Sequence, residues 1–309
     1  MTGAVHSPTD LPLLAARLRA GELVAFPTET VYGLGADATN SDAVLKIYET
    51  KGRPRFNPLI VHVADLAMAE TLVRFSPLAQ RLAAFWPGPL TLVLPKRADA
   101  KLSDLVTAGL ETVGIRIPAH KLALELIRAA GRPLAAPSAN RSGKLSPTTA
   151  AQVQLSFGGA VPVLEGGASQ AGVESTILAV DGDVVTQLRA GALPRDEVEA
   201  AIGQAIGVAK HDAAIAAPGM LASHYAPNAT LRLDAETAEP GETYLGFGPG
   251  REGANLSPTG DLREAARNLF SLLHMLDETA SRIAVAPIPH RGLGEAINDR
   301  LKRAAAPRD

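Results

Sequence analysis

The chain has 309 residues, of which 46% are hydrophobic, and at about 150 residues per domain this length predicts two domains with a sizeable core. It contains no cysteine, which excludes disulfides, thiolate metal sites and thiol nucleophiles and fits a reducing cytoplasm. The formal net charge of −2 disfavours a protein that binds nucleic acid mainly through its phosphates, and no stretch approaches the ~20 apolar residues of a membrane span.

Strands and helices alternate over residues 10–205, after a polar N-terminus that has no apolar signal core. The hydrophobic periods predict strands at 23–26, 59–63, 90–94, 113–117, 134–136, 161–164, 177–180 and 184–188. They predict helices at 11–18, 42–50, 66–75, 77–86, 119–130, 148–157 and 194–202. This alternation is typical of an α/β domain with an open, twisted, mixed sheet and flanking helices.

The alternation stops over residues 206–227, which we expect to be a linker, and it resumes over residues 228–309. There the pattern predicts strands at 244–247 and 283–286 and helices from Asp261 and over 294–305, which together form a small Rossmann-like α/β domain. The run G-x-G-x-x-G at 248–253 follows a strand but precedes no helix directly, so we interpret it as a chance match.

Hydroxyls, glycines and cations gather after the first strands. Residues 27–35 read as a loop rich in hydroxyls and glycines, and the helix at 42–50 runs into a loop that carries Lys51 and Arg53. These groups suit a small anionic ligand, because arginine grips phosphate or carboxylate bidentately and lysine acts as a point charge. The alternatives are a plain turn and cations that complement a helix dipole in water. In either case we expect Lys51 and Arg53 to be exposed.

Two polar residues interrupt apolar strands. His62 points away from Val61 and Val63 in its strand, and it could be a hydrogen-bonded core histidine or a ligand-binding group. Arg116 also lies in an apolar strand and therefore needs an anionic partner, which could be Glu174 or the carboxylate of a bound amino acid.

Several motifs together resemble the YrdC-like family, in its form with a linker and a small C-terminal domain. They occur in family order with no departure at the matched positions, and the resemblance covers residues 10–227, with the rest matching in architecture. The motifs are PTETVYGL at 27–34, K-x-R at 51–53, VGIRIP at 113–118, APSAN at 136–140, ESTI at 174–177 and SHYAP at 223–227.

The resemblance implies that the domain at 10–205 makes L-threonylcarbamoyl-AMP and pyrophosphate from L-threonine, bicarbonate and ATP, which is the first step of threonylcarbamoyl-adenosine formation in tRNA. It assigns threonine binding to Thr30, His62, Arg116, Ser175 and the backbone of Ala136, with Arg116 on the carboxylate. It assigns ATP binding to Arg53, Asn57, Thr112, Ser138, Ser146, Arg189 and Tyr225, the last closing over ATP from the linker at 206–227. The polar tetrad expected to serve catalysis is Lys51, Arg53, Ser138 and Asn140.

The resemblance also sets expectations for cofactors and partners. Mg²⁺ would be held chiefly by the ATP phosphates, because no carboxylate cluster marks a metal site made by the protein. The product would pass to a downstream threonylcarbamoyl transferase, without a required contact with tRNA. One alternative is a binding module that uses the same cleft without chemistry, either for RNA, which the neutral charge disfavours as the main partner, or as a ligand sensor. Another is a carbamoyl-transfer protein of hydrogenase maturation, whose zinc-finger segments the absence of cysteine excludes.

Overall fold

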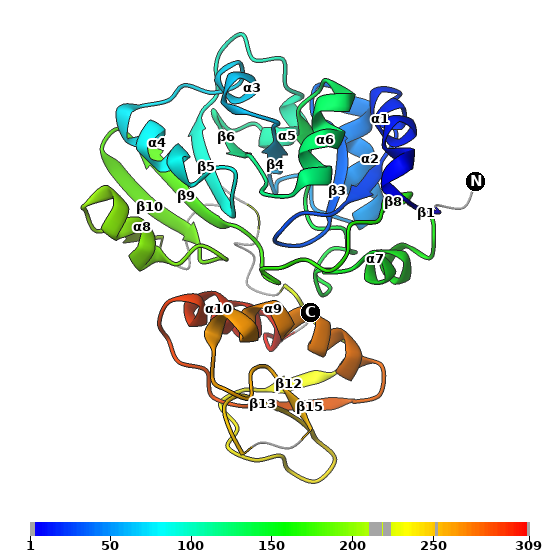
Figure 1. Ribbon diagram of the computed structural model, residues 1–309, viewed down its shortest axis with the longest axis vertical. Coiled ribbons are helices and arrows are strands. Elements are labelled where there is room, and N and C mark those ends of the chain that lie inside the picture. The colour runs from blue at the N-terminus through cyan, green and yellow to red at the C-terminus, as the bar shows by residue number, and fades with distance from the viewer. Residues whose placement is uncertain (1–3, 210–217, 219–223, 251–252, 308–309) are drawn as a thin grey trace.

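The computed structural model describes residues 4–209, 218, 224–250 and 253–307, and it places them in two α/β domains (Figure 1). The first domain is built on an 11-stranded mixed sheet and the second on a four-stranded parallel sheet. The expected fold class is therefore confirmed. Helices α9 and α10 of the C-terminal domain lie between the two sheets and face the first domain. Within the described ranges, no helix is long and apolar enough to cross a membrane.

The first sheet has strands in an order far from their order in the chain. In spatial order they are β1 (Val5–His6), β8 (Val163–Leu164), β2 (Val24–Phe26), β3 (Gly33–Asp37), β7 (Leu134–Ala135), β4 (Ile60–His62), β6 (Thr112–Arg116), β5 (Leu90–Pro95), β9 (Thr176–Asp181), β10 (Val184–Arg189) and β11 (Gly207–Val208). The strands predicted at 177–180 and 184–188 form a hairpin, since β9 and β10 pair antiparallel around Gly182. The first residues of the expected linker form β11, which pairs with β10.

Helices pack on both faces of this sheet. They are α1 (Leu11–Arg19), α2 (Ser41–Lys51), α3 (Leu66–Glu70), α4 (Pro77–Leu82), α5 (Asp104–Thr107), α6 (Lys121–Ala130), α7 (Ala150–Phe157) and α8 (Arg195–Ile202), with short 3-10 turns at Pro8–Asp10 and Ala83–Phe85. One buried cluster joins α1 and α6 to the sheet, and a larger one joins α2, α4, α7 and α8 to the opposite face. The helices expected at 66–75 and 77–86 are shorter than we predicted.

Strand β3 corrects the sequence analysis, because residues 33–37 belong to the sheet and not to a loop. The run is antiparallel to β2, with Phe26 opposite Gly33 and Val24 opposite Gly35. The ring of Phe26 lies directly over this strand, so that a Cβ at Gly35 would sit 2.7 Å from its Cε1. Glycine is therefore needed for close packing here, and it hides the alternation from which a strand is recognised.

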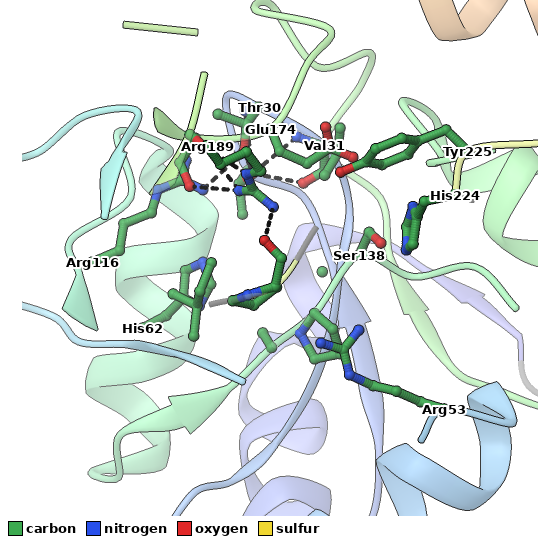
Figure 2. A pocket seen from close by; sticks show the side chains of 17 residues that line it. Thr30, Val31, Arg53, His62, Arg116, Ser138, Glu174, Arg189, His224 and Tyr225 are labelled. Carbon is green, nitrogen blue, oxygen red and sulfur yellow. Dashed lines mark hydrogen bonds between the residues drawn. The ribbon is translucent and has the colours of Figure 1, made fainter. Parts of the chain in front are cut away.

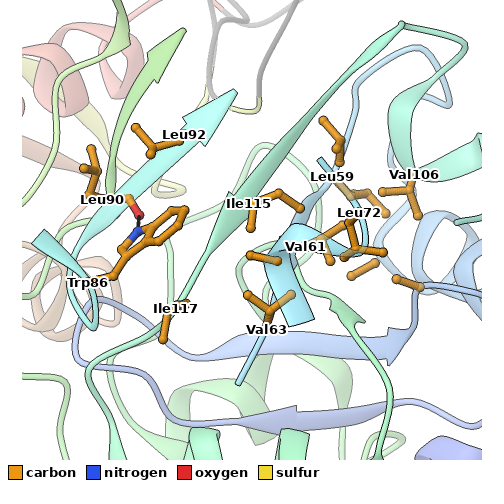
Figure 3. Packing of buried hydrophobic residues seen from close by; sticks show 14 of the residues in the cluster. Leu59, Val61, Val63, Leu72, Trp86, Leu90, Leu92, Val106, Ile115 and Ile117 are labelled. Atoms are coloured by element: carbon orange, nitrogen blue, oxygen red, sulfur yellow. Dashed lines mark hydrogen bonds between the residues drawn. The ribbon is translucent and has the colours of Figure 1, made fainter. Parts of the chain in front are cut away.

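Side chains along the central strands point alternately into the hydrophobic core and toward the opposite face of the sheet. Figure 3 shows Val61 and Ile115 among the buried apolar side chains, and these two residues are direct partners in β4 and β6. Their neighbours His62 and Arg116 are also direct partners, on the opposite face. Each polar side chain thus points away from the apolar side chains of its own strand, as the pattern of that strand predicted, and the pairing of β4 with β6 places the two side by side.

The C-terminal domain has strands in the order β12 (Thr230–Arg232), β15 (Arg282–Val285), β13 (Thr243–Gly246) and β14 (Ala254–Asn255), with helices α9 (Leu262–Asp277) and α10 (Leu293–Ala304). Asp261 caps the N-terminus of helix α9, and its side chain accepts a hydrogen bond from the Glu264 N–H. Its apolar face belongs to a buried cluster that also contains Val31, Leu145 and Val173 of the first domain. The two domains therefore share this one buried cluster.

Candidate active site

A cavity opens where the ends of strands β4, β6, β7 and β10 meet the segment at 224–225. Figure 2 shows the polar side chains that converge on it. The described residues that line it are Thr28, Thr30, Val31, Gly33, Arg53, Ile60, His62, Arg116, Ala136, Pro137, Ser138, Glu174, Ser175, Arg189, Pro218, His224 and Tyr225. The structure therefore brings together nine residues expected from the sequence: Thr30, Arg53, His62, Arg116, Ala136, Ser138, Ser175, Arg189 and Tyr225.

Arg116 is held at one end of this cavity by three groups. Its Nη2 lies 2.7 Å from Glu29 Oε1, its Nη1 donates to Thr30 Oγ1 at 2.9 Å, and its Nε donates to the Gly88 carbonyl at 3.2 Å. The protein carboxylate is therefore Glu29 and not Glu174, because the turn at 28–31 folds back over the end of β6. The guanidinium is fixed on one side and faces the cavity on the other, which suits an incoming carboxylate.

His62 stands beside Arg116 as a neutral imidazole. Its side chain is buried, and burial together with the Arg116 cation lowers the pKa of His62 to about 3. Its ring meets that of Phe26 edge-on, with centroids 6.0 Å apart. Among the residues that the structure describes, its Nδ1 has no hydrogen-bond partner. His62 can therefore offer a hydrogen bond to a ligand without adding charge.

Lys51 and Arg53 are buried, which contradicts the expected exposure. Lys51 Nζ donates to the carbonyls of Ser138, at 2.6 Å, and Asn140. Arg53 donates through Nε to the Asn57 carbonyl at 3.2 Å and through Nη2 to the Pro58 carbonyl at 2.9 Å. The loop folds inward because these carbonyls satisfy both cations.

The charge on these two cations is not neutralised by a nearby acid. In the described part of the chain neither has a carboxylate within 4.0 Å. Burial lowers the pKa of Arg53 to about 10, and burial followed by the Arg53 charge lowers the pKa of Lys51 well below its ordinary value. Arg53 reaches the cavity, whereas Lys51 lies behind Ser138. The region therefore favours an anion.

Ser175 and Arg189 form the opposite wall. Arg189 donates through Nε and Nη2 to the Ser175 carbonyl at 3.2 and 2.9 Å, and its Nη2 also donates to Ser175 Oγ at 3.2 Å. Thr91 Oγ1 lies 2.8 Å from the same hydroxyl. The hydroxyl and the guanidinium are thus positioned as one unit facing the cavity.

Tyr225 comes from the expected linker and is fixed by both domains. It has φ +61°, its ring centroid lies 5.6 Å from that of Phe270, and the next residue, Ala226, donates to the Gly143 carbonyl at 2.7 Å. His224 is also buried, and burial lowers its pKa to about 3. Other linker residues, at 210–217 and 219–223, lie outside the described residues.

The remaining expected site residues lie near the cavity or farther off. Asn140 and Ser146 are buried behind its wall, Asn140 next to Lys51 and Ser146 against Glu174. The buried side chain of Asn57 has no hydrogen-bond partner within the described ranges. Thr112 begins β6 beside Pro95 and is not among the lining residues. His224 was missed, although its place beside Tyr225 in the SHYAP motif was the signal.

Comparisons with known proteins match both domains. A family model described as "Telomere recombination" (Sua5_yciO_yrdC) matches residues 16–191, and one described as "Threonylcarbamoyl-AMP synthase, C-terminal domain" matches residues 193–306. The chain is 43% identical to the threonylcarbamoyl-AMP synthase of Bacillus subtilis, over 95% of this chain and 92% of that one. It is 42% identical to that of Pyrococcus abyssi, over 95% and 93%.

A solved structure has the same two-domain form. The crystal structure of P. abyssi Sua5 complexed with L-threonine matches with a TM-score of 0.88 and 40% identity, over 98% of this chain and 96% of that chain. The likeness to Escherichia coli YciO, at a TM-score of 0.53 and 18% identity over 62% of this chain and 92% of that one, concerns the fold alone.

Proposed function

The chain belongs to the threonylcarbamoyl-AMP synthase family, and from that membership we propose that it joins L-threonine, bicarbonate and ATP into L-threonylcarbamoyl-AMP. The threonine amine adds to bicarbonate and water leaves, which gives a carbamate. A carbamate oxygen then attacks the α-phosphorus of ATP, and pyrophosphate leaves. The step is an adenylyl transfer, so the enzyme acts as a nucleotidyltransferase and supplies the first step of threonylcarbamoyl-adenosine formation in tRNA.

The observation that carries this proposal is one cavity with separate cationic ends. At one end Arg116 is neutralised in part by Glu29 and backed by Thr30, which suits the single charge of an amino-acid carboxylate. His62 and Ser175 supply hydrogen bonds for the amine and hydroxyl, and the Ala136 backbone lies alongside. This end is the threonine subsite.

The other end carries charge for a polyphosphate. Arg53 and Arg189 line the cavity and donate to carbonyl oxygens, Arg189 also to the Ser175 hydroxyl, and among the described residues neither has a carboxylate within 4.0 Å. Figure 2 shows Ser138 on the side of the cavity where Arg53 lies, across from Arg116 and His62. Tyr225 covers this end, and Lys51 stands behind Ser138. Cations that are already fixed in a site without water stabilise the charge that develops on the phosphates, because no side chain or solvent has to reorganise. Asn57, Thr112, Asn140 and Ser146 complete the proposed set.

Positioning supplies most of the catalysis in this proposal. His62 has a pKa of about 3 and is therefore a weak base. Its role in this proposal is to orient the threonine amine by a hydrogen bond, and not to remove a proton from the ammonium form. Fixing amine, bicarbonate and α-phosphate in line converts separate encounters into one intramolecular sequence. The cations then stabilise the carbamate and the departing pyrophosphate.

Magnesium enters as a companion of ATP. Among the described residues that line the cavity, Glu174 is the one with a carboxylate. The described residues also contain no group of three or more His, Asp or Glu side chains that could bind a metal. Oxygen ligands for Mg²⁺ would therefore come mainly from the triphosphate, where the ion offsets phosphate charge. The product would pass to a threonylcarbamoyl transferase.

Pyrophosphate release tests the proposal directly. The enzyme is incubated with ATP and Mg²⁺, and threonine or bicarbonate is omitted in turn, with threonylcarbamoyl-AMP followed by mass spectrometry. We expect release only when all three substrates are present. Ligand binding without pyrophosphate release would indicate a sensing or binding module, and release without threonine would exclude this reaction.

A further inference from the structure

A buried arginine of the C-terminal domain reaches into the first domain behind the cavity. Arg300 lies on α10 and is 1% exposed. Its Nε donates to Glu174 Oε2 at 2.8 Å, and its Nη1 donates to the Ala190 carbonyl at 2.9 Å and to Asp299 Oδ2 at 2.7 Å. Two of these partners belong to the other domain, so this side chain joins the domains by charged contacts.

Arg300 binds the two segments that carry Ser175 and Arg189. Glu174 directly precedes Ser175, and Ala190 directly follows Arg189. The segments lie against each other, because a Cβ at Gly191 would sit 2.3 Å from the Ser175 carbonyl carbon. Any shift of Glu174 or Ala190 is therefore passed to the wall of the cavity.

Arg300 also touches the segment that covers the nucleotide end. Its Cζ lies 5.1 Å from the centroid of the Tyr225 ring, and the centroid of that ring lies 5.6 Å from that of Phe270. The same helix holds the neighbouring residue, because the His224 N–H donates to the Arg303 carbonyl at 3.3 Å. Helix α10 thus fixes three parts of the site at once.

The charge balance around Glu174 explains why an arginine is needed. Burial alone would raise the pKa of Glu174, but Arg300, Arg189 and the hydrogen bond from Ser146 bring that pKa below its ordinary value. Both arginines therefore stabilise the Glu174 anion, and among the described residues only Arg300 lies within ion-pair distance of it. Loss of Arg300 would leave the buried Glu174 carboxylate without its ion-pair partner, and Arg189 would be the next cation that acts on it.

We propose that Arg300 is a positioning residue that neutralises Glu174 and thereby leaves Arg189 free to bind the nucleotide phosphates. This inference rests on the proposed function, since it assigns Arg189 to ATP. It makes the C-terminal domain part of the nucleotide site without contact between that domain's arginine and the ligand.

Three variants separate this role from simple domain docking. Arg300→Met removes the charge, Arg300→Met with Glu174→Gln removes both charges, and Arg195→Gln is the matched control. Arg195 Nη2 lies 2.9 Å from Glu295 Oε1 of the same helix α10, so it also joins the two domains, but it does not line the cavity. Pyrophosphate release gives KM and kcat for each variant, calorimetry gives the threonine affinity, and thermal unfolding gives stability.

We expect Arg300→Met to raise the KM for ATP by roughly tenfold or more, with a smaller loss of threonine affinity, because a mispositioned charge contact changes binding by such factors. The double variant restores the charge balance, so its KM for ATP should return most of the way to the wild-type value. Arg195→Gln should keep both constants within about twofold, as partly exposed ion pairs contribute little.

Two results would overturn the inference: an unchanged KM for ATP in Arg300→Met, or a double variant no better than the single one. If Arg300→Met does not fold, the double variant Arg300→Met with Glu174→Gln, which leaves neither charge of the pair buried alone, is measured against the wild type, and a KM for ATP raised roughly tenfold or more in it overturns the inference. Wild-type protein that releases no pyrophosphate refutes the proposed function instead. The threonine affinities of the variants remain measurable in that case, and equal affinities would also count against a positioning role.

Discussion

The cations of the cavity and those of the C-terminal sheet are held in opposite ways. In the cavity, Arg53 and Arg189 bind carbonyl oxygens, and their charge is left available. On the C-terminal sheet, Arg232 and Arg282 flank Glu242, with Arg282 Nη2 3.2 Å from Glu242 Oε1. A carbonyl fixes the geometry of a guanidinium without cancelling its charge, whereas a carboxylate does both. The first arrangement prepares a ligand site, and the second stabilises a surface.

The largest loss of activity is expected when a cation held by carbonyl groups is removed from the cavity. Arg53→Ala should lower kcat/KM for ATP by about 10²–10³, because a preorganised charge is lost from a dry site. Lys51→Ala should have a similar effect and should also lower the melting temperature, since two buried carbonyls lose their donor. Pyrophosphate release and thermal unfolding measure the two effects, and near-normal turnover in a folded Arg53→Ala enzyme would contradict the assignment.

A change of substrate tests the part of the cavity that carries no charge. Val31, Ile60 and Ala136 line it, and one of them or a neighbour should receive the threonine methyl group. Serine should therefore be poorer by about 10–200-fold in kcat/KM, the usual worth of one methyl group in an apolar pocket. Equal rates with serine and threonine would show that no methyl pocket exists.

Acid should destabilise the cavity because two neutral histidines are buried among its cations. The pKa values of His62 and His224 are about 3 when folded and about 6.5 when unfolded. The unfolded chain thus binds more protons between these values, and stability falls as the pH drops through this window, by up to about 1.4 kcal/mol per pH unit for each histidine. Denaturant unfolding from pH 7 to 4 measures how steeply the free energy of unfolding falls with pH. His62→Gln should make this fall less steep. An unchanged dependence on pH would show that His62 does not titrate in this range.

The smallest effect is expected where a carboxylate already neutralises the cation. Arg232→Gln should leave kcat and KM unchanged, because Arg232 lies far from the cavity, and should lower the melting temperature only slightly, because Arg282 remains a partner of Glu242. The measurements are those used for Arg53→Ala, so the two variants form a direct contrast. A large loss of activity in Arg232→Gln would remove the distinction between the two kinds of cation.

Local pattern revealed the strands that carry His62 and Arg116, because the alternation of apolar residues is visible in the sequence. It could not reveal that Glu29 is the partner of Arg116, since that contact depends on how a turn folds over a strand far along the chain. The burial of Arg53 was missed for a similar reason, because carbonyl partners leave no trace in the residue types. The only signal for Arg300 was its spacing from Ala296 and Ile297, which are buried on the same face of α10.

The hydrophobic cluster that crosses the domain boundary has a consequence for biosynthesis. Val31 is synthesised long before the residues of α9 that share its buried cluster. The nascent chain therefore carries an uncovered apolar surface until α9 has been made. The cavity is also completed late relative to its first residues, because His224 and Tyr225 line it together with Thr28 and Thr30.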